Sequence, residues 1–250
     1  MDAMQIIDTH VHLGTSKFSG VTAAETDIVA AMDRYGIAVS LVMPQPTLED
    51  VPTVHRAIAG MCRVYPGRVY GMVSLDPWME EEAYLEQVRI CVEEYRFVAL
   101  KLHPAGHNIS PLSPRCDKLY EAARHYRLPV LVHTGLGTPS SLPSLLIEPA
   151  GRYPDVTFVL AHAGFAIYTD EAIVAAKTRD NIVLEPSWCP SYSVRKMVDQ
   201  IGAERMIMGS DHISNLPVEL AKYGAIGLSD DQLEQIYERN PRRIFQLPQS

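Results

Sequence analysis

Runs of β-forming residues alternate with segments of helical composition along the 250-residue chain, and this alternation limits the possible folds more than any other feature. The expected strands are residues 6–12, 39–44, 69–75, 97–103, 130–133, 157–162, 182–185 and 205–211. The expected helices, one after each strand, are residues 22–35, 51–64, 80–95, 114–126, 142–153, 169–178, 191–201 and 216–224. Because such alternation produces parallel strands joined by right-handed crossovers, eight units predict an α/β fold of the (β/α)8, or TIM-barrel, type.

A further helical segment, residues 230–245, follows the last of these units. Its apolar side chains available for packing are Leu233, Ile236, Tyr237 and Phe245. We therefore expect an additional C-terminal helix that covers the barrel wall from outside. No long Gly/Ser linker and no low-complexity segment interrupts the pattern, which predicts a single domain over residues 1–250.

Titratable side chains end six of the eight expected strands. They are His10 and His12, Lys101 and His103, His133, His162, Glu185 and Asp211. Because residues i and i+2 of a strand point to the same face, His10 and His12 are expected to project side by side. Barrel enzymes carry their chemistry at the carboxyl ends of the strands, so this pattern predicts an active site there.

Four of these side chains suit a metal ion. His10, His12 and His133 offer imidazole nitrogens and Asp211 offers a carboxylate, a donor set that fits zinc first, with manganese, iron, nickel or cobalt as alternatives. Water bound to such a cation has a pKa of about 7 and becomes a nucleophile at neutral pH. We expect Asp211 both to contact the metal and to accept the proton of that water, and His162 to orient the water or polarise the substrate.

Short motifs at the same places resemble a known family. DTHVH at 8–12, VHTG at 132–135, LAHAG at 160–164, MGSD at 208–211 and NPRRIF at 240–245 resemble the amidohydrolase superfamily, and within it the amidohydrolase-related (amidohydrolase 2) group of metal-dependent TIM-barrel hydrolases and decarboxylases. That group includes aminocarboxymuconate semialdehyde and resorcylate decarboxylases. The resemblance implies that His10, His12, His133 and Asp211 are metal ligands and that His162 holds the catalytic water or acts as acid or base.

The resemblance also bears on Lys101. Binuclear branches of the superfamily use a carboxylated lysine or a glutamate on the fourth strand as a bridge between two ions, whereas the mononuclear character of the similar group favours an uncarboxylated Lys101. Better-known members are longer, which implies short βα loops here.

The remaining strand-end residues have two readings. Lys101, His103, Glu185 and the loop residue Trp188 are candidates for binding the substrate, with Lys101 or His103 facing an anionic group. Lys101 and Glu185 could instead pair with each other and satisfy both charges inside the barrel mouth. The sequence leaves both readings open.

Charge and segment composition restrict the partners and the location. A formal net charge of -8 argues against nucleic acid or an anionic membrane surface as the main partner, so we expect a small-molecule substrate, with a carboxylate as one candidate. The first residues lack a secretion signal, no run approaches the roughly 20 apolar residues of a membrane span, and four separated cysteines indicate reduced thiols. These features predict a cytoplasmic protein, and the family resemblance makes a homodimer a candidate assembly.

Three functions follow, in order of preference. The first is a hydrolase in which a metal-activated water attacks an amide, lactone or ester carbonyl. The alternative is a metal-dependent decarboxylase of an unsaturated or aromatic carboxylic acid. A barrel that binds a metal or ligand without turnover ranks last, because Asp211 and His162 are both present.

Overall fold

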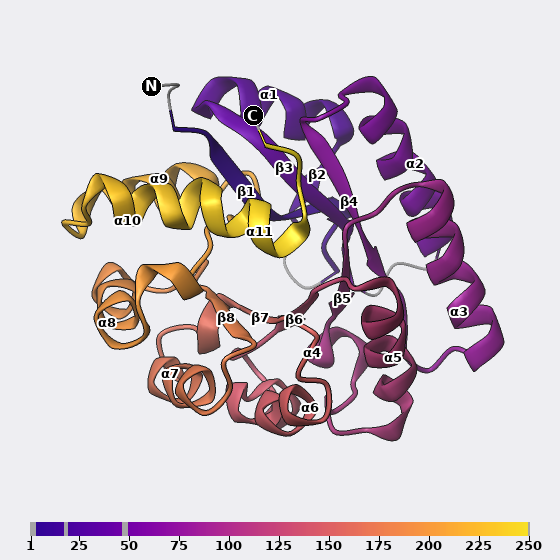
Figure 1. The fold of residues 1–250 in the computed structure, drawn as a ribbon. Helices are drawn as coiled ribbons and strands as arrows, with labels where there is room; N and C mark the ends of the chain where they lie inside the picture. Colours follow the sequence, from indigo (N-terminus) through magenta and orange to yellow (C-terminus); the bar gives the residue numbers. More distant parts are fainter. Residues whose placement is uncertain (1–3, 18–19, 47–49, 250) are drawn as a thin grey trace.

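A curled sheet of mainly parallel strands forms the centre of the molecule in the computed structural model, which describes residues 4–17, 20–46 and 50–249 (Figure 1). Its strands are β1 (Ile6–Thr15), β2 (Thr22–Ala23), β3 (Ile37–Pro44), β4 (Val69–Ser74), β5 (Ala99–Leu102), β6 (Val130–His133), β7 (Phe158–Ala161) and β8 (Ile182–Glu185). Their order is β2-β1-β3-β4-β5-β6-β7-β8, and only the short β2, which the sequence did not predict, pairs in the antiparallel sense. The expected α/β class is confirmed, but in place of eight parallel barrel strands the curled sheet of the described residues contains seven parallel strands and the antiparallel β2.

The expected eighth strand at 205–211 is not a regular strand. It contributes two isolated parallel bridges, Leu184 with Met206 on one side and Val11 with Asp211 on the other. A φ of 66° at Asp211 takes the backbone out of the extended region at the end of this segment. The segment nevertheless hydrogen-bonds to both β8 and β1 and so connects the two edges of the sheet.

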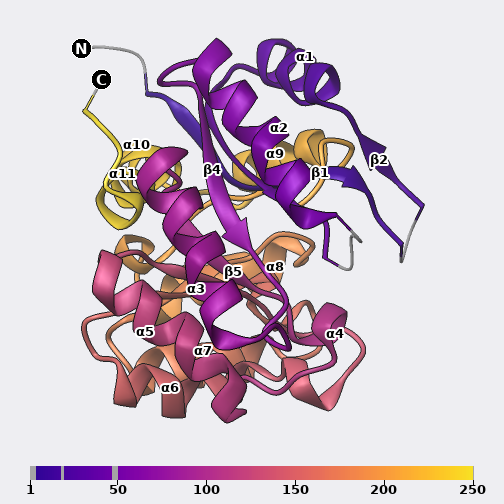
Figure 2. The same ribbon diagram turned by 90° about the vertical axis from the view of Figure 1, so that its right-hand side faces the viewer.

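Helices surround the sheet, as Figure 2 shows from the side. They are α1 (Glu25–Tyr35), α2 (Val51–Val64), α3 (Glu81–Arg89), α5 (Asp117–Tyr126), α6 (Ile147–Arg152), α7 (Thr169–Thr178), α8 (Ser191–Ile201) and α9 (Leu216–Ala225), with the short α4 (Pro104–His107) in the loop after β5. The helices predicted at 51–64, 169–178 and 191–201 have the expected bounds. The helix predicted at 80–95 is regular only to Arg89 and ends in a π-helical turn, Ile90–Glu94.

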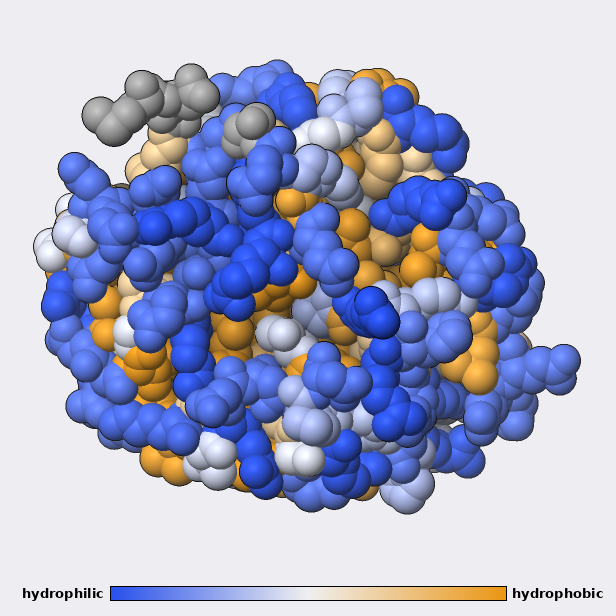
Figure 3. Space-filling view, in the orientation of Figure 1, coloured by the Kyte–Doolittle hydropathy of each residue, from blue (hydrophilic) through white to orange (hydrophobic). Residues whose placement is uncertain are grey.

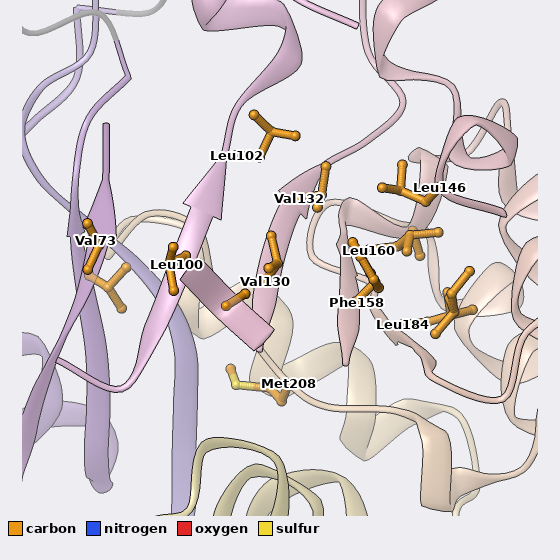
Figure 4. Close-up of a cluster of buried hydrophobic side chains, with 14 of the residues drawn as sticks. Val73, Leu100, Leu102, Val130, Val132, Leu146, Phe158, Leu160, Leu184 and Met208 are labelled. Atoms are coloured by element: carbon orange, nitrogen blue, oxygen red, sulfur yellow. The ribbon is translucent and has the colours of Figure 1, made fainter. Parts of the chain in front are cut away.

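Two apolar layers result from the alternation of side chains along the strands. The outer layer lies between the sheet and the helices and includes Leu100, Leu102, Val130, Val132 and Leu160 (Figure 4). The inner layer lies inside the curled sheet and is formed by Ile7, Val39, Leu41, Met43, Met72, Ala99, Leu131, Val159, Val183 and Ile207. The interior is therefore a packed core and not a channel.

The C-terminal segment contributes to both layers. It consists of α10 (Asp230–Glu234), a π-helical turn (Gln235–Arg239) and α11 (Asn240–Phe245), and it crosses in front of the sheet in Figure 1. Ile236 and Tyr237 pack in the outer layer, as expected for a helix on the wall, but Phe245 joins the inner one.

The inner-layer contact corrects the expectation that this segment lies only outside the wall. Gln246 donates a hydrogen bond of 2.7 Å to the carbonyl of Arg127, which precedes β6, so the chain end covers the amino ends of the strands. Around this covered end the surface is mainly hydrophilic, with apolar side chains visible in the gaps (Figure 3). Among the described residues, no helix combines the length and apolarity required to cross a bilayer.

We expect Phe245→Ala to lower the free energy of unfolding by about 3–5 kcal/mol, because the ring is 1% exposed and its removal leaves a cavity at the closed end. Urea denaturation followed by circular dichroism measures the loss. The control Val218→Ala, at a side chain 60% exposed on α9, should change stability by less than about 0.5 kcal/mol. A loss below about 1 kcal/mol for Phe245→Ala would contradict the role given to this contact.

Candidate active site

Two histidines of β1 and the carboxylate of Asp211 converge at the carboxyl end of the sheet. The Nε2 atoms of His10 and His12 lie 3.1 Å apart, and the Oδ1 atom of Asp211 lies 3.2 Å from the first and 3.3 Å from the second. The i, i+2 spacing on one strand puts both imidazoles on one face, and the bridge between Val11 and Asp211 brings the carboxylate beside them.

Two more histidines complete the cluster from neighbouring strands. Donor atoms of His10, His162 and Asp211 all lie within 4.8 Å of one another, a separation at which they could hold one metal ion. His133 packs against His162 with ring centroids 4.8 Å apart and stacks on His103 at 4.1 Å. The structure therefore brings His10, His12 and Asp211 into direct contact, places His162 beside them, and connects His133 to the group through His162.

The hydrogen bonds behind the cluster point its nitrogens inward. Nδ1 of His10 is 2.8 Å from Glu185 Oε2, and Nδ1 of His12 is 2.9 Å from the carbonyl of Pro44, so each Nδ1–H donates outward and leaves Nε2 with a lone pair. Nδ1 of His133 is buried and has no hydrogen-bond partner within the described part of the chain. Several lone pairs directed at one another are unfavourable without a cation, so this donor set fits a divalent metal ion.

Burial and charge set the protonation states. Burial lowers the pKa of His10, His133 and His162 well below the usual range, so these imidazoles are neutral at pH 7. Burial raises the pKa of Asp211, but the neighbouring His162 and His10 outweigh this effect and hold it well below its usual value. A carboxylate that stays ionised beside neutral imidazoles is the pattern required for binding a cation.

Lys101 and Glu185 lie beneath the cluster. Each is at most 1% exposed, and neither lines the cavity above the histidines. Nζ of Lys101 is 3.1 Å from Nε2 of His10, whose other nitrogen contacts Glu185. Burial lowers the pKa of Lys101 to about 8 and raises that of Glu185 to about 7.

The loop after β8 connects Asp211 and His162. The indole N–H of Trp188 donates to Asp211 Oδ2 at 2.8 Å, and the hydroxyl of Ser187 lies 2.7 Å from Nδ1 of His162. His162, Trp188 and Asp211 have φ values of 64°, 64° and 66°, a conformation that is uncommon for residues with side chains. Such strain persists only where the surrounding contacts maintain it.

Helix α9 supplies those contacts, which the sequence analysis missed. Glu219 accepts the backbone N–H of Trp188 at 2.9 Å and forms an ion pair with Lys222, which donates to the carbonyls of Pro186 and Cys189 at 2.9 and 3.0 Å. Both charged side chains are buried. The i, i+3 spacing of Glu219 and Lys222 was visible in the sequence but does not reveal what the pair touches.

An open cavity of about 530 Å³ lies above the cluster. Its lining includes His12, His103, His133, His162, Trp188, Asp211, Gln45, Leu136, Phe165 and His212. His103 and Trp188, both predicted to bind substrate, therefore border it, whereas Lys101 and Glu185 lie below.

Comparison with known proteins identifies the family. A family model described as Amidohydrolase matches residues 7–247. The chain belongs to the amidohydrolase family. The resemblance inferred from the strand-end motifs is thereby confirmed, while no curated protein matches the sequence.

Solved structures similar to this amidohydrolase-family protein include two decarboxylases and a probable hydrolase. The 5-carboxyvanillate decarboxylase from Sphingomonas paucimobilis is 13% identical, with a TM-score of 0.77 and coverage of 98% of this chain and 100% of that chain. The dihydroxybenzoic acid decarboxylase from Polaromonas sp. JS666, solved with manganese and 2-nitroresorcinol, is 14% identical, with a TM-score of 0.79 and coverage of 99% and 98%. A probable 2-pyrone-4,6-dicarboxylic acid hydrolase from Acinetobacter baumannii, with citric acid bound, is 14% identical, with a TM-score of 0.71 and coverage of 97% and 100%. At these identities the similarity shows a shared fold.

We expect Lys222→Met to lower the free energy of unfolding by about 3–5 kcal/mol, because it leaves the buried Glu219 without its charge partner. Denaturant titration measures the change. The matched control is Lys196→Met, since Lys196 pairs with Asp170 at the exposed surface and such pairs contribute about 0–1 kcal/mol. Equal effects of the two substitutions would show that the α9 ion pair does not maintain the loop.

Proposed function

We propose that this amidohydrolase-family protein is a metal-dependent decarboxylase of an unsaturated or aromatic carboxylic acid. The observation that carries the proposal is the position of the histidine and aspartate cluster at the base of a cavity whose sides include Leu136, Phe165 and Trp188. Such a cavity suits a planar apolar acid with its carboxylate directed at the cluster. The decarboxylases of similar fold support this reading, so the order of the two enzymatic hypotheses from the sequence is reversed.

We assign the metal to His10, His12, His133 and Asp211, with zinc or manganese as the leading candidates; manganese gains weight from the similar structure that contains it. When bound, the divalent cation supplies a positive charge that neutralises and orients the substrate carboxylate and the developing anion. Glu185 accepts from Nδ1 of His10 and so fixes the direction of its ring from below.

The proton is moved by the chain's own groups. Decarboxylation breaks the bond between the ring or vinyl carbon and the carboxylate carbon, and a proton replaces the departing carbon dioxide on that carbon. Asp211, ionised at rest, takes up a proton from water in the open cavity and passes it to that carbon, with its Oδ2 oriented by the indole of Trp188. His162, held by Ser187, orients the substrate, and His103 forms part of the side wall.

Hydrolysis of a lactone, amide or ester stays the second candidate. The same cluster would then direct a water at a carbonyl carbon, with Asp211 accepting its proton and His162 stabilising the oxyanion. The probable lactone-type hydrolase of similar fold supports this reading.

Metal content is the first test. The untagged protein, purified without added metal, should contain about one transition-metal ion per chain by plasma mass spectrometry, because one cluster offers three imidazoles and one carboxylate. The variant His10→Ala/His12→Ala should lose it. No metal even after incubation with zinc or manganese would overturn the mechanism, and about two ions per chain would indicate a bridging Lys101.

Assays with candidate substrates distinguish decarboxylation from hydrolysis. Hydroxybenzoates should release carbon dioxide, whereas lactones and amides should not react. Asp211→Asn should lower kcat at least about a hundredfold without loss of circular dichroism, because it removes the proton carrier. Asp180→Asn, at a fully exposed carboxylate, is the matched control and should retain activity. Turnover of lactones alone would establish the hydrolase, and ligand binding without any turnover would establish a non-catalytic barrel.

A further inference from the structure

The cavity has a polar base and largely apolar sides. We call the group His12, His133, His162 and Asp211 the base, since these residues belong to the metal-type cluster described above. A volume of about 530 Å³ is large enough for one ring with its substituents.

The sides of the cavity are formed by the loops that follow the strands. Their apolar residues are Val21, Pro46, Leu136, Phe165 and Trp188. Leu136 is 57% exposed and Trp188 is 45% exposed, so both present free apolar surface to a ligand. The polar groups on the sides, such as Gln45 and His212, are neutral hydrogen-bonding groups.

Positive charge is confined to one end of this space. None of the described residues that line the cavity is a lysine or an arginine. The ammonium group of Lys101 is 1% exposed and contacts His10 beneath the base, so it does not reach a ligand along the sides. A metal ion held at the base would add charge at that same end.

A ligand carboxylate therefore meets positive charge only at the base. A second carboxylate on the same ring would lie among Leu136, Phe165 and Trp188 and neutral groups such as Gln45, where no lysine or arginine of the described lining balances its charge. The overall charge of -8 increases this penalty for a dianion.

We propose that the site selects acids with a single carboxylate and a neutral, mainly apolar remainder, and rejects acids with a second ring carboxylate. Leu136, Phe165 and Trp188 determine this specificity. The inference rests on the proposed function, because it assigns the one accepted carboxylate to the reacting end.

The test compares two acids that differ by one carboxylate. Salicylate and 4-hydroxyisophthalate share a ring, a phenol and an adjacent carboxylate, and the second acid carries one more carboxylate. Binding to the zinc-loaded protein is measured by the fluorescence of Trp188 in a Trp78→Phe background, since the chain has two tryptophans and Trp78 does not line the cavity. We expect 4-hydroxyisophthalate to bind at least roughly tenfold more weakly than salicylate.

A gain of function makes the test specific to the cavity side. Leu136→Arg should improve binding of 4-hydroxyisophthalate relative to salicylate by roughly tenfold, because it adds a cation where the second carboxylate lies. Leu136→Gln, similar in polarity but neutral, should not. Equal or tighter binding of the dicarboxylate by the starting protein, absence of a response to both acids, or no gain with Leu136→Arg would overturn the inference.

Binding affinity and carbon dioxide release are measured in separate assays, so the specificity inference and the decarboxylase assignment can fail independently. If salicylate is preferred but no hydroxybenzoate releases carbon dioxide, the decarboxylase assignment fails and the specificity inference stands. If carbon dioxide is released from monocarboxylates and dicarboxylates at equal rates, the decarboxylase assignment stands and the specificity inference fails.

Discussion

Closure of the curled sheet between β1 and residues 206–211 is the constraint on which both the fold and the site depend. The buried carboxyl group of Asp8 accepts the backbone N–H of Ser210 at 2.9 Å and the backbone N–H of His10 at 3.2 Å, and it also bonds the Ser210 hydroxyl at 2.6 Å. The N–H of Asp211 donates to the carbonyl of His10 at 2.6 Å. The same bonds that connect the first and last segments of the sheet therefore set the separation of the proposed metal ligands. Burial raises the pKa of Asp8 to about 7, which shows how strongly this junction excludes water.

The two ends of the sheet differ in how they are covered. The C-terminal segment places Phe245 in the inner core and covers the amino ends of the strands. At the carboxyl end, short loops leave an open cavity above the histidines. The strained residues His162, Trp188 and Asp211 all lie at this open end.

The chemistry proposed for this amidohydrolase-family protein depends on the contrast between base and sides. Neutral imidazoles and an ionised Asp211 attract a cation, while apolar sides favour a planar remainder of the substrate. A hydrolase and a decarboxylase can share the first feature. The apolar sides favour an acid whose carboxylate is its one charged group. Trp188 belongs to both parts of the site, because its ring lines the side of the cavity and its indole N–H donates to Asp211 at the base. Glu219 of α9 holds the loop that carries Trp188.

Much of this arrangement was present in the sequence. The order of strands and helices, the candidate ligands and the family all follow from local patterns, because side-chain alternation and strand-end motifs are properties of short segments. Ser187, the α9 ion pair and the bond between Asp8 and Ser210 were not found, since each acts on residues that only folding brings near; the last pair is separated by 202 positions. The irregular segment 206–211 and the inner position of Phe245 likewise depend on which surfaces meet when the sheet closes. The sequence by itself determined which groups stand at the strand ends, and only the tertiary structure decided which of them face the cavity and which lie beneath it, because burial and pairing are set by contacts between distant segments.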